Sequence, residues 1–279
     1  MSRLIIRAGA TERHYWTDLW RYRELFFFLS WRDILVRYKQ TAIGVSWALI
    51  RPILTIAVFT VIFGRIANVP PDGLPFAVFV CAGNLPWQFF ATAMAEASNS
   101  LILNANMLSK IYFPRLIVPT SAVIVAFVDL VISLAIMATL MIWYHVMPTW
   151  RLLTLPLFIA LGLAAALSVG LWLSALNVKY RDFRYVIPFV VQFGFFVSPV
   201  GYSSDFFIKK LYDMKIGEAI YTVYLLNPMV GVIDGFRWAI GGQAALSINL
   251  IFSVLVIALF GVSGLRYFRR TEKKFADII

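Results

Sequence analysis

Long apolar runs alternate with short polar or basic segments along most of the chain after residue 42. A helix needs about 20 apolar residues, each rising about 1.5 Å, to cross about 30 Å of hydrocarbon. Six runs reach or approach that length: 43–66, 74–97, 117–143, 152–175, 186–202 and 246–265. The pattern predicts an all-α integral membrane protein with six transmembrane helices. The fifth is the shortest and contains Gln192, Ser198 and Pro199.

The segment before the first span has a different, helical periodicity. Trp31, Ile34, Leu35 and Tyr38 recur at i, i+3, i+4 and i+7, and charged residues fill the rest of the circumference. This spacing predicts an N-terminal amphipathic interface helix between about residues 15 and 40, lying in the headgroup region. We therefore divide the chain into an N-terminal cytoplasmic segment (1–42), a permease domain (43–265) and a basic tail (266–279).

The connection 203–245, between the fifth and sixth spans, is long and partly apolar. Asn227-Pro228 is typical of a helix N-cap followed by proline at the first helical position. The run 229–240 that follows is too short to cross a bilayer. We expect short re-entrant or gate helices here, dipping into or lying on the outer leaflet.

Basic residues set the predicted orientation. Eighteen lysines and arginines fall on the side of the termini and six on the other, while Arg51 lies within the first span. By the positive-inside rule both termini are cytoplasmic, as an even number of spans requires. The same distribution explains the net charge of +11 without a nucleic-acid partner.

Composition excludes several protein classes. Hydrophobic residues make up 61% of the chain and charged residues 14%, whereas soluble domains carry about 25% charged residues. The single cysteine, Cys81, excludes an intrachain disulfide, and His14 and His145 are too isolated to suggest a metal site. The chain contains no Gly-Lys dipeptide and so no G-x-x-x-x-G-K-[ST] phosphate loop, and no catalytic motif stands out. We expect a chain that is not an enzyme and carries no metal or cofactor of its own.

Charged residues inside the predicted spans are costly unless they are paired or line water. Arg51 and Asp129 lie at comparable depths in the first and third spans, so an ion pair between them is geometrically allowed. Glu96, near the end of the second span, is the competing partner of Arg51. We favour structural pairing or pore lining over a proton relay.

Two spans carry polar and aromatic stripes. Tyr185, Phe189, Gln192 and Phe196 recur on one face of the fifth span, and the first span offers Trp47, Arg51 and Thr55. Aromatic rings with an interleaved amide suit sliding sugar rings. Aromatic stripes in membrane helices also pack against other helices or lipid, so the pattern alone leaves both interpretations open.

Two basic, aromatic loops, 104–115 (NANMLSKIYFPR) and 177–184 (NVKYRDFR), lie on the predicted cytoplasmic side. Such loops fit a groove on a cytoplasmic ATPase, and they also fit membrane-surface loops that obey the positive-inside rule. The residues alone do not separate the two.

The chain resembles the permease subunits of bacterial ATP-binding-cassette polysaccharide exporters, the type-2 family that moves O-antigen, capsular glycans and teichoic acids. The resemblance rests on the order and spacing of six blocks: RYKQTAIGVSWALIRPIL (37–54), AGNLPWQFF (82–90), SNSLILNANMLSKIYFPRLIVP (98–119), ALNVKYRDFRYVIPF (175–189), FVSPVGY (196–202) and LNPMVGVIDGFRWAIGG (226–242).

The resemblance implies a homodimer that binds two copies of a separate ATPase, which would hold ATP and Mg²⁺, in the bacterial inner membrane. The first and fifth spans of both copies would line a channel for a polyprenyl-diphosphate-linked polysaccharide. Candidate ATPase-coupling residues are Trp31, Arg32, Arg37, Tyr38, Lys110, Tyr112, Phe113, Arg115, Tyr180, Arg181 and Asp182. Candidate outer-gate residues are Asn227, Pro228, Asp234 and Arg237. Residues 1–14 receive no role.

Two alternatives remain. An ion-gradient-driven transporter or lipid flippase predicts inverted repeats with broken helices at the midplane, and no convincing repeat is visible. A membrane transferase acting on a polyprenyl lipid would need a cluster of catalytic carboxylates or histidines at one membrane face, and none stands out.

Overall fold

The computed structural model describes residues 15–39, 44–212, 217–241, 246–273 and 275. Within these residues all regular secondary structure is helical, which confirms the predicted fold class. The helices are α1 (Tyr15–Arg21), α2 (Arg23–Lys39), α3 (Gly44–Phe59), η1 (Thr60–Ile66), α4 (Phe76–Leu103), α5 (Ala105–Leu108), α6 (Ile117–Trp143), η2 (Trp150–Thr154), α7 (Leu155–Lys179), α8 (Phe183–Val197), α9 (Ser204–Tyr212), α10 (Gly217–Leu225), α11 (Met229–Ile240) and α12 (Asn249–Glu272).

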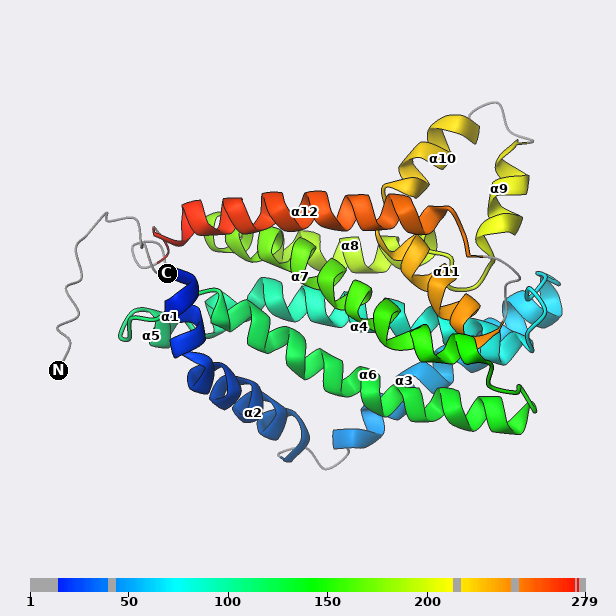
Figure 1. Cartoon of the computed structure of the whole chain (residues 1–279), viewed down its shortest axis with the longest axis horizontal. Helices are drawn as coiled ribbons and strands as arrows, with labels where there is room; N and C mark the ends of the chain where they lie inside the picture. Colours follow the sequence, from blue (N-terminus) through cyan, green and yellow to red (C-terminus); the bar gives the residue numbers. More distant parts are fainter. Residues whose placement is uncertain (1–14, 40–43, 213–216, 242–245, 274, 276–279) are drawn as a thin grey trace.

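The long helices run along a common direction, with α4 at the centre (Figure 1). Helices α6 and α7 pack against α4, and α12 packs along α7. The first described helix and the end of α12 lie at one end of the bundle, together with α5, and α9 to α11 lie at the other. We call these the terminal end and the distal end.

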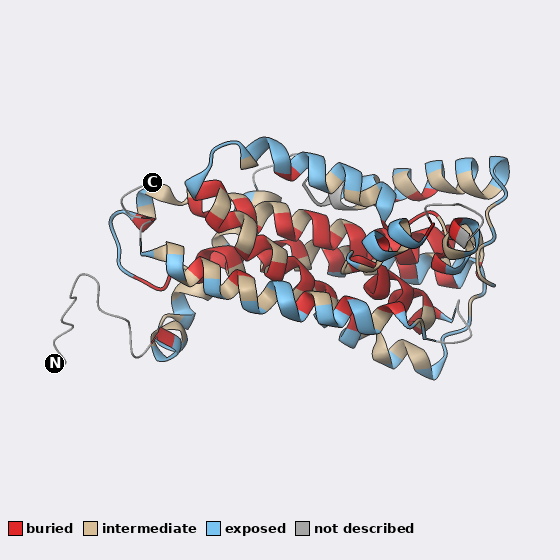
Figure 2. Ribbon diagram, turned by 90° about the horizontal axis from the view of Figure 1, so that it is seen from above, coloured by how far each residue is buried: buried red, intermediate tan, exposed pale blue. Residues whose placement is uncertain are grey.

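Helix α4 forms the core of the bundle, because it is buried along most of its length while the outer helices expose one face (Figure 2). Small residues allow its neighbours to approach: a Cβ on Gly170 of α7 would lie 2.9 Å from the Cβ of Ala97. Such contacts are typical of membrane helices, whose packing depends on close approach rather than on exclusion of water.

Within the described residues, five helical segments are long and apolar enough to cross a membrane, or six if the bent pair α10 and α11 forms one span. The predicted first span continues from α3 into η1, a π-helix, so that 49–66 forms one apolar segment. The predicted fifth span is different: α8 ends at Val197, and Ser198 is extended. Its 15 residues rise only about 22 Å, which is too short to cross the hydrocarbon alone.

The segment between α8 and α12 folds into α9, α10 and α11, and α10 and α11 meet at a bend of 76°. Helix α11 lies inside the bundle rather than on its surface, where one of the two expected placements would have put it. It is almost entirely buried among α4, α7 and α12. Gly241 closes it in the left-handed conformation, with φ of 105°, which glycine adopts without strain.

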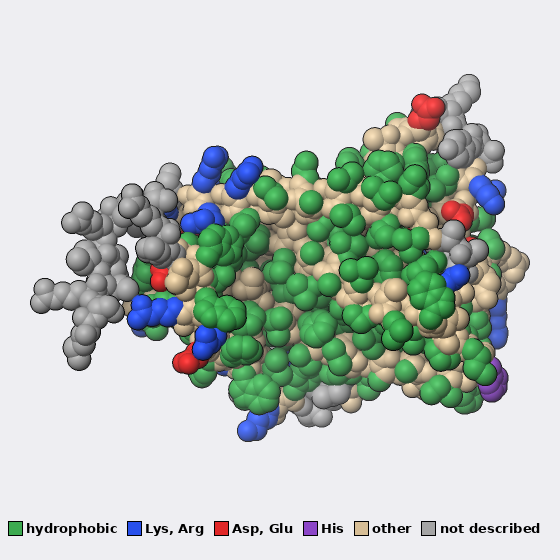
Figure 3. All heavy atoms as spheres, viewed as in Figure 1, with side chains coloured by type: hydrophobic (Ala, Val, Ile, Leu, Met, Phe, Trp, Pro, Cys, Tyr) green, Lys and Arg blue, Asp and Glu red, His purple; other side chains and the backbone are tan. Residues whose placement is uncertain are grey.

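The surface agrees with a membrane environment. In Figure 3 hydrophobic side chains cover the middle of the visible face, and Lys and Arg side chains gather toward its two ends. Large exposed apolar residues such as Phe260, Leu259 and Leu255 follow the outer face of α12. This arrangement suits a bundle whose middle is surrounded by lipid and whose two ends lie in water.

Candidate functional site

A charged cluster joins α2 to two membrane helices near the terminal end. The Arg37 guanidinium binds the Glu96 carboxylate of α4 at 2.7 Å and the Asp129 carboxylate of α6 at 3.0 Å. Asp129 also accepts a hydrogen bond from the Tyr38 hydroxyl. Burial, followed by the hydrogen bond to Asp129, raises the pKa of the Tyr38 phenol, so the hydroxyl remains a donor. One helix outside the spans is thus bound to two spans through charge.

This cluster corrects the predicted charge pair. Among the described residues Arg51 forms no ion pair with Asp129 or Glu96; its side chain is exposed on α3, and Arg37 occupies the place predicted for it. The prediction of Arg51 rested only on its position along the first span, at a depth similar to that of Asp129. The interface helix, however, packs against α6, so an arginine from outside the spans reaches both carboxylates.

The orientation of α2 also differs from the predicted amphipathic helix. Arg37 and Tyr38 face the bundle, whereas Trp31, from the expected apolar stripe, is exposed. Leu29 and Ser30 form the buried side instead. The Arg32 guanidinium donates to the side-chain oxygen of Asn104, the residue that follows α4, at 2.9 Å. Three of the four predicted coupling residues on α2 therefore hold the helix in place.

The loop between α4 and α6 is anchored by its second half. Phe113 is buried, and the Arg115 backbone N–H donates to the Glu272 carboxylate of α12 at 2.9 Å. The Arg115 guanidinium donates to the Glu272 carbonyl oxygen. The Tyr15 hydroxyl reaches the same carboxylate at 3.4 Å. Glu272 therefore joins the first described helix, the loop and the last helix.

The remaining predicted coupling residues are accessible. All of them expose their side chains, on α2, on the second half of the 104–115 loop beside its buried Phe113, or between α7 and α8: Trp31, Lys110, Tyr112, Tyr180, Arg181 and Asp182. These residues form a basic and aromatic surface, which we call the terminal surface. It is available to a protein that approaches along the bundle axis.

The predicted stripe of α8 is exposed along its whole length. Tyr185 is 83% exposed, Phe189 58% and Phe196 65%, and Gln192 is exposed between them. On α3, Arg51 is exposed, Thr55 is half-buried and donates to the Arg51 carbonyl oxygen, and the Trp47 side chain lies outside the described residues. The two helices meet near their distal ends, where the Phe59 and Phe195 rings are 5.3 Å apart.

At the distal end, Arg237 of α11 is completely buried. Its guanidinium donates to the Val200 and Tyr202 carbonyl oxygens at 2.9 Å each, and it lies 3.7 Å from the centre of the Phe79 ring. Carbonyl dipoles and an aromatic face thus replace the water that a buried cation loses.

Asp234, one turn earlier on α11, is also buried. Its carboxylate accepts hydrogen bonds from Ser204 at 2.8 Å and from the Asn249 amide at 3.2 Å. The Tyr224 hydroxyl lies 2.8 Å from Ser204. Residues from α9, α10, α11 and α12 therefore share one network, which sequence spacing did not reveal because Ser204, Tyr224 and Asn249 belong to different segments.

The start of α11 differs from the predicted cap by one position. Pro228 precedes the helix rather than beginning it, and the Asn227 side-chain oxygen accepts a hydrogen bond from the Met229 N–H at 3.0 Å. The Asn227 amide donates to Ser198 at 2.9 Å, just beyond α8. Of the four predicted gate residues, Asn227 and Arg237 hold α11 against the segment that follows α8, whereas Asp234 bonds to α9 and α12.

Comparison with known proteins identifies the family to which the chain belongs. Residues 24–241 match the family described as ABC-2 type transporter. The chain is 28% identical over 266 residues to the O-antigen export system permease protein RfbA of Myxococcus xanthus, covering 94% of this chain and 98% of that protein. It is 25% identical over 259 residues to the RfbA permease of Klebsiella pneumoniae, covering 92% and 95%.

A further relative is the polysialic acid transport protein KpsM of Escherichia coli, 23% identical over 250 residues, with 87% of this chain and 91% of that protein covered. The family match includes the helices from α2 to α11, and thus the charged cluster, the α8 stripe and the distal network apart from Asn249. The chain belongs to the ABC-2 type transporter family.

Proposed function

We propose that this chain is the channel-forming membrane subunit of an ATP-driven exporter. Its cargo would be a polyprenyl-diphosphate-linked polysaccharide, moved from the cytoplasm to the outer face of the bacterial inner membrane. Relatives named as O-antigen and polysialic acid transport proteins support the cargo class. ATP and Mg²⁺ would bind a separate ATPase subunit, and this chain would have no enzyme activity of its own.

The observation that carries the proposal is the exposed face of α8. Three large aromatic side chains and an amide follow one side of a helix that is too short to span the membrane. Flat rings offer apolar faces to sugar rings, and the Gln192 amide can both donate and accept hydrogen bonds with hydroxyls. A face of this kind suits a polymer that slides past, because no single contact is specific or strong.

In a single chain the stripe of α8 is exposed, so a passage along it would need a second surface to close it. Exposed residues of α3, among them Ile53, Leu54 and Val58, leave that helix largely uncovered as well. We propose that two copies of the chain pair so that α3 and α8 of both line one passage. The pairing would also cover apolar area that one copy exposes.

The orientation follows from charge. The terminal end carries most of the lysines and arginines, so it would face the cytoplasm under the positive-inside rule. The terminal surface would then contact the ATPase, and two ATPase copies would serve the two permease copies. Movement of the ATPase would reach α4 and α6 through the Arg37 cluster.

The channel is tested by substitution on α8. Phe189→Ala and Phe196→Ala should each reduce surface polysaccharide without reducing the amount of permease or its ATPase complex. Leu259→Ala is a matched control, because Leu259 is equally exposed but lies on α12. Normal export in both α8 variants would contradict the proposed lining.

The ATPase contact is tested at exposed residues of the terminal surface. Lys110→Glu combined with Arg181→Glu should dissociate or uncouple the ATPase, measured by co-purification and by ATP hydrolysis. Lys209→Glu, exposed at the distal end, is the control. Arg115 is unsuitable because it binds Glu272 within the chain, so its loss would disturb the loop itself. Intact, coupled complexes in the double variant would argue against this surface.

The gradient-driven alternative is separated by energy source. Export by the purified permease and ATPase in vesicles should require ATP and persist when the ion gradient is collapsed. Transport by this chain alone, driven by an ion gradient, would refute the proposal.

A further inference from the structure

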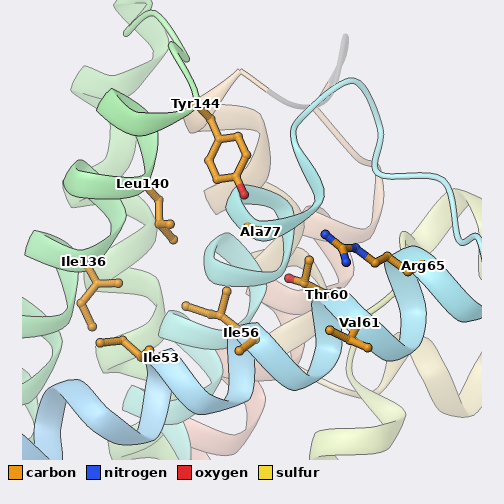
Figure 4. Close-up of a pocket in the computed structure, with 10 residues that line it drawn as sticks. Ile53, Ile56, Thr60, Val61, Arg65, Ala77, Ile136, Leu140 and Tyr144 are labelled. Carbon is orange, nitrogen blue, oxygen red and sulfur yellow. The ribbon is translucent and has the colours of Figure 1, made fainter.

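A second feature, outside the α8 face, is a groove of about 340 Å³ near the distal end. Its walls are the outer half of the first span and the end of α6, and the start of α4 closes its base. The lining residues are Ile53, Ile56, Ala57, Thr60, Val61, Arg65, Ala77, Ile136, Leu140 and Tyr144 (Figure 4).

The groove changes character along its length. Ile53 and Ile136 lie at one end, while the Thr60 hydroxyl, the Tyr144 ring and the Arg65 guanidinium lie toward the other (Figure 4). Twelve positions separate Ile53 from Arg65, roughly 18 Å of helix. One leaflet of a bilayer with about 30 Å of hydrocarbon is of similar thickness. The apolar part therefore fits one lipid chain, and the polar part reaches headgroup depth.

The charge at the polar end is that of Arg65. Among the described residues no carboxylate oxygen lies within 4.0 Å of the Arg65 guanidinium, whose side chain is exposed. Arginine binds phosphate oxygens with two parallel hydrogen bonds, so a phosphate is the natural complement here.

Two further observations point to a ligand at the same place. The Thr60 hydroxyl oxygen is buried and has no hydrogen-bond partner in the structure. A buried hydroxyl without a partner is costly, and a bound polar group removes that cost. Thr60 also begins the π-helix that carries Arg65, and π-helical turns inside longer helices occur frequently at functional sites.

We propose that this groove binds a glycerophospholipid of the distal leaflet. Arg65 binds its phosphate, Thr60 hydrogen-bonds an ester or glycerol oxygen, and one acyl chain lies along Ile53, Ile136 and Leu140. The lipid would fill the space between the first span and α6 and hold the outer half of the first span in place. The proposal does not depend on the exported cargo.

The test is native mass spectrometry of the purified full-length chain with added 1-palmitoyl-2-oleoyl-phosphatidylglycerol. Arg65→Gln should reduce the bound lipid about tenfold or more, because the charge-assisted hydrogen bonds to the phosphate are lost. Lys209→Gln removes a positive charge elsewhere at the distal end and should leave binding unchanged. Thr60→Val, which keeps the side-chain shape, should reduce binding by a smaller factor.

Ala57→Phe provides a variant that fills the groove without changing charge, and it should also abolish retention of the lipid. It keeps the test decisive if Arg65→Gln fails to fold. Diacylglycerol without a phosphate should bind poorly. Equal lipid retention by the wild type and the folded groove variants, or equal binding of diacylglycerol, would overturn the proposal.

Two further experiments test for other occupants of the groove. Preferential retention of undecaprenyl phosphate over the phospholipid would assign the groove to the lipid carrier and overturn the proposal. A disulfide between two copies of an Ala57→Cys variant would show that a second copy covers the groove, with the same consequence. The native Cys81 is buried and does not interfere.

Discussion

The two ends of the bundle hold an arginine in opposite ways. At the distal end, Arg237 is fully buried and is bound by the carbonyl oxygens of Val200 and Tyr202 and by a ring. At the terminal end, Arg37 is about one-third exposed and is bound by carboxylates of two different helices. Backbone carbonyl groups hold the first, and side-chain carboxylates of two separate helices hold the second. We infer a rigid distal end and an adjustable terminal end.

The largest expected effect comes from removing the distal arginine. Arg237→Met leaves buried carbonyl groups unpaired and should cost about 4 kcal/mol, in the range for breaking a buried charged site. The measurement is the apparent melting temperature of the purified protein, with the yield of folded chain. Arg184→Met, at an exposed position, should change neither. An unchanged melting temperature in Arg237→Met would remove the contrast between the two ends.

The Arg237 site can also be tested by adding a side-chain carbon at Gly83, which lies next to it. A Cβ at Gly83 would lie 2.8 Å from an Arg237 guanidinium nitrogen and 2.9 Å from the Val200 carbonyl oxygen. Gly83→Ala should therefore cost about 1–3 kcal/mol. Gly162→Ala is the matched control, because its Cβ would meet Val232 at an ordinary 3.6 Å and alanine favours helix. Equal melting temperatures in the two variants would show that the distal end yields easily.

The terminal cluster should respond differently. Arg37→Gln should lower stability by only about 1 kcal/mol, since partly exposed ion pairs are screened by solvent. A double-mutant cycle of Arg37→Gln with Glu96→Gln measures the coupling. Export should fall much more than stability, because the link between α2 and the spans is lost. A loss of export no larger than the loss of folded protein would assign the cluster a purely structural role.

The smallest effect is expected at Tyr15. Tyr15→Phe removes one 3.4 Å hydrogen bond to Glu272 and should cost about 0.5 kcal/mol. Thermal unfolding measures it, with Tyr22→Phe on the same terminal segment as the control. A change as large as that of Arg237→Met would mean that the terminal end is as rigid as the distal end.

The sequence predicted the ends of helices well where a long apolar run defined them. It predicted them less well where polar side chains form hydrogen bonds to backbone groups of the same helix. The range 117–143 coincides with α6, and 229–240 with α11. Helix α4, by contrast, continues six residues beyond the predicted 97. Ser98, Asn99 and Ser100 donate to carbonyl oxygens of the preceding turn, so the helix itself supplies partners for the polar side chains that follow the predicted end of the span.

The candidate site also has parts that the sequence predicted and parts that it did not. The exposed stripe on α8 follows from helical periodicity, and its residues lie on one face as predicted. The partner of Asp129 could not be found this way, because Arg37 precedes it by 92 positions and lies outside the spans. The interactions of Glu272 and Asn249 depend on tertiary contact, for which no local pattern exists.

The distal network also has a consequence for synthesis of the chain. Asp234 accepts a hydrogen bond from Asn249, which leaves the ribosome fifteen residues later, and α11 packs against α12, which follows it. Helix α11 therefore reaches the membrane before α12 is made, with a carboxylate that the bilayer disfavours. Its final burial must wait until α12 inserts, so truncation before α12 should expose α11 to quality-control proteases.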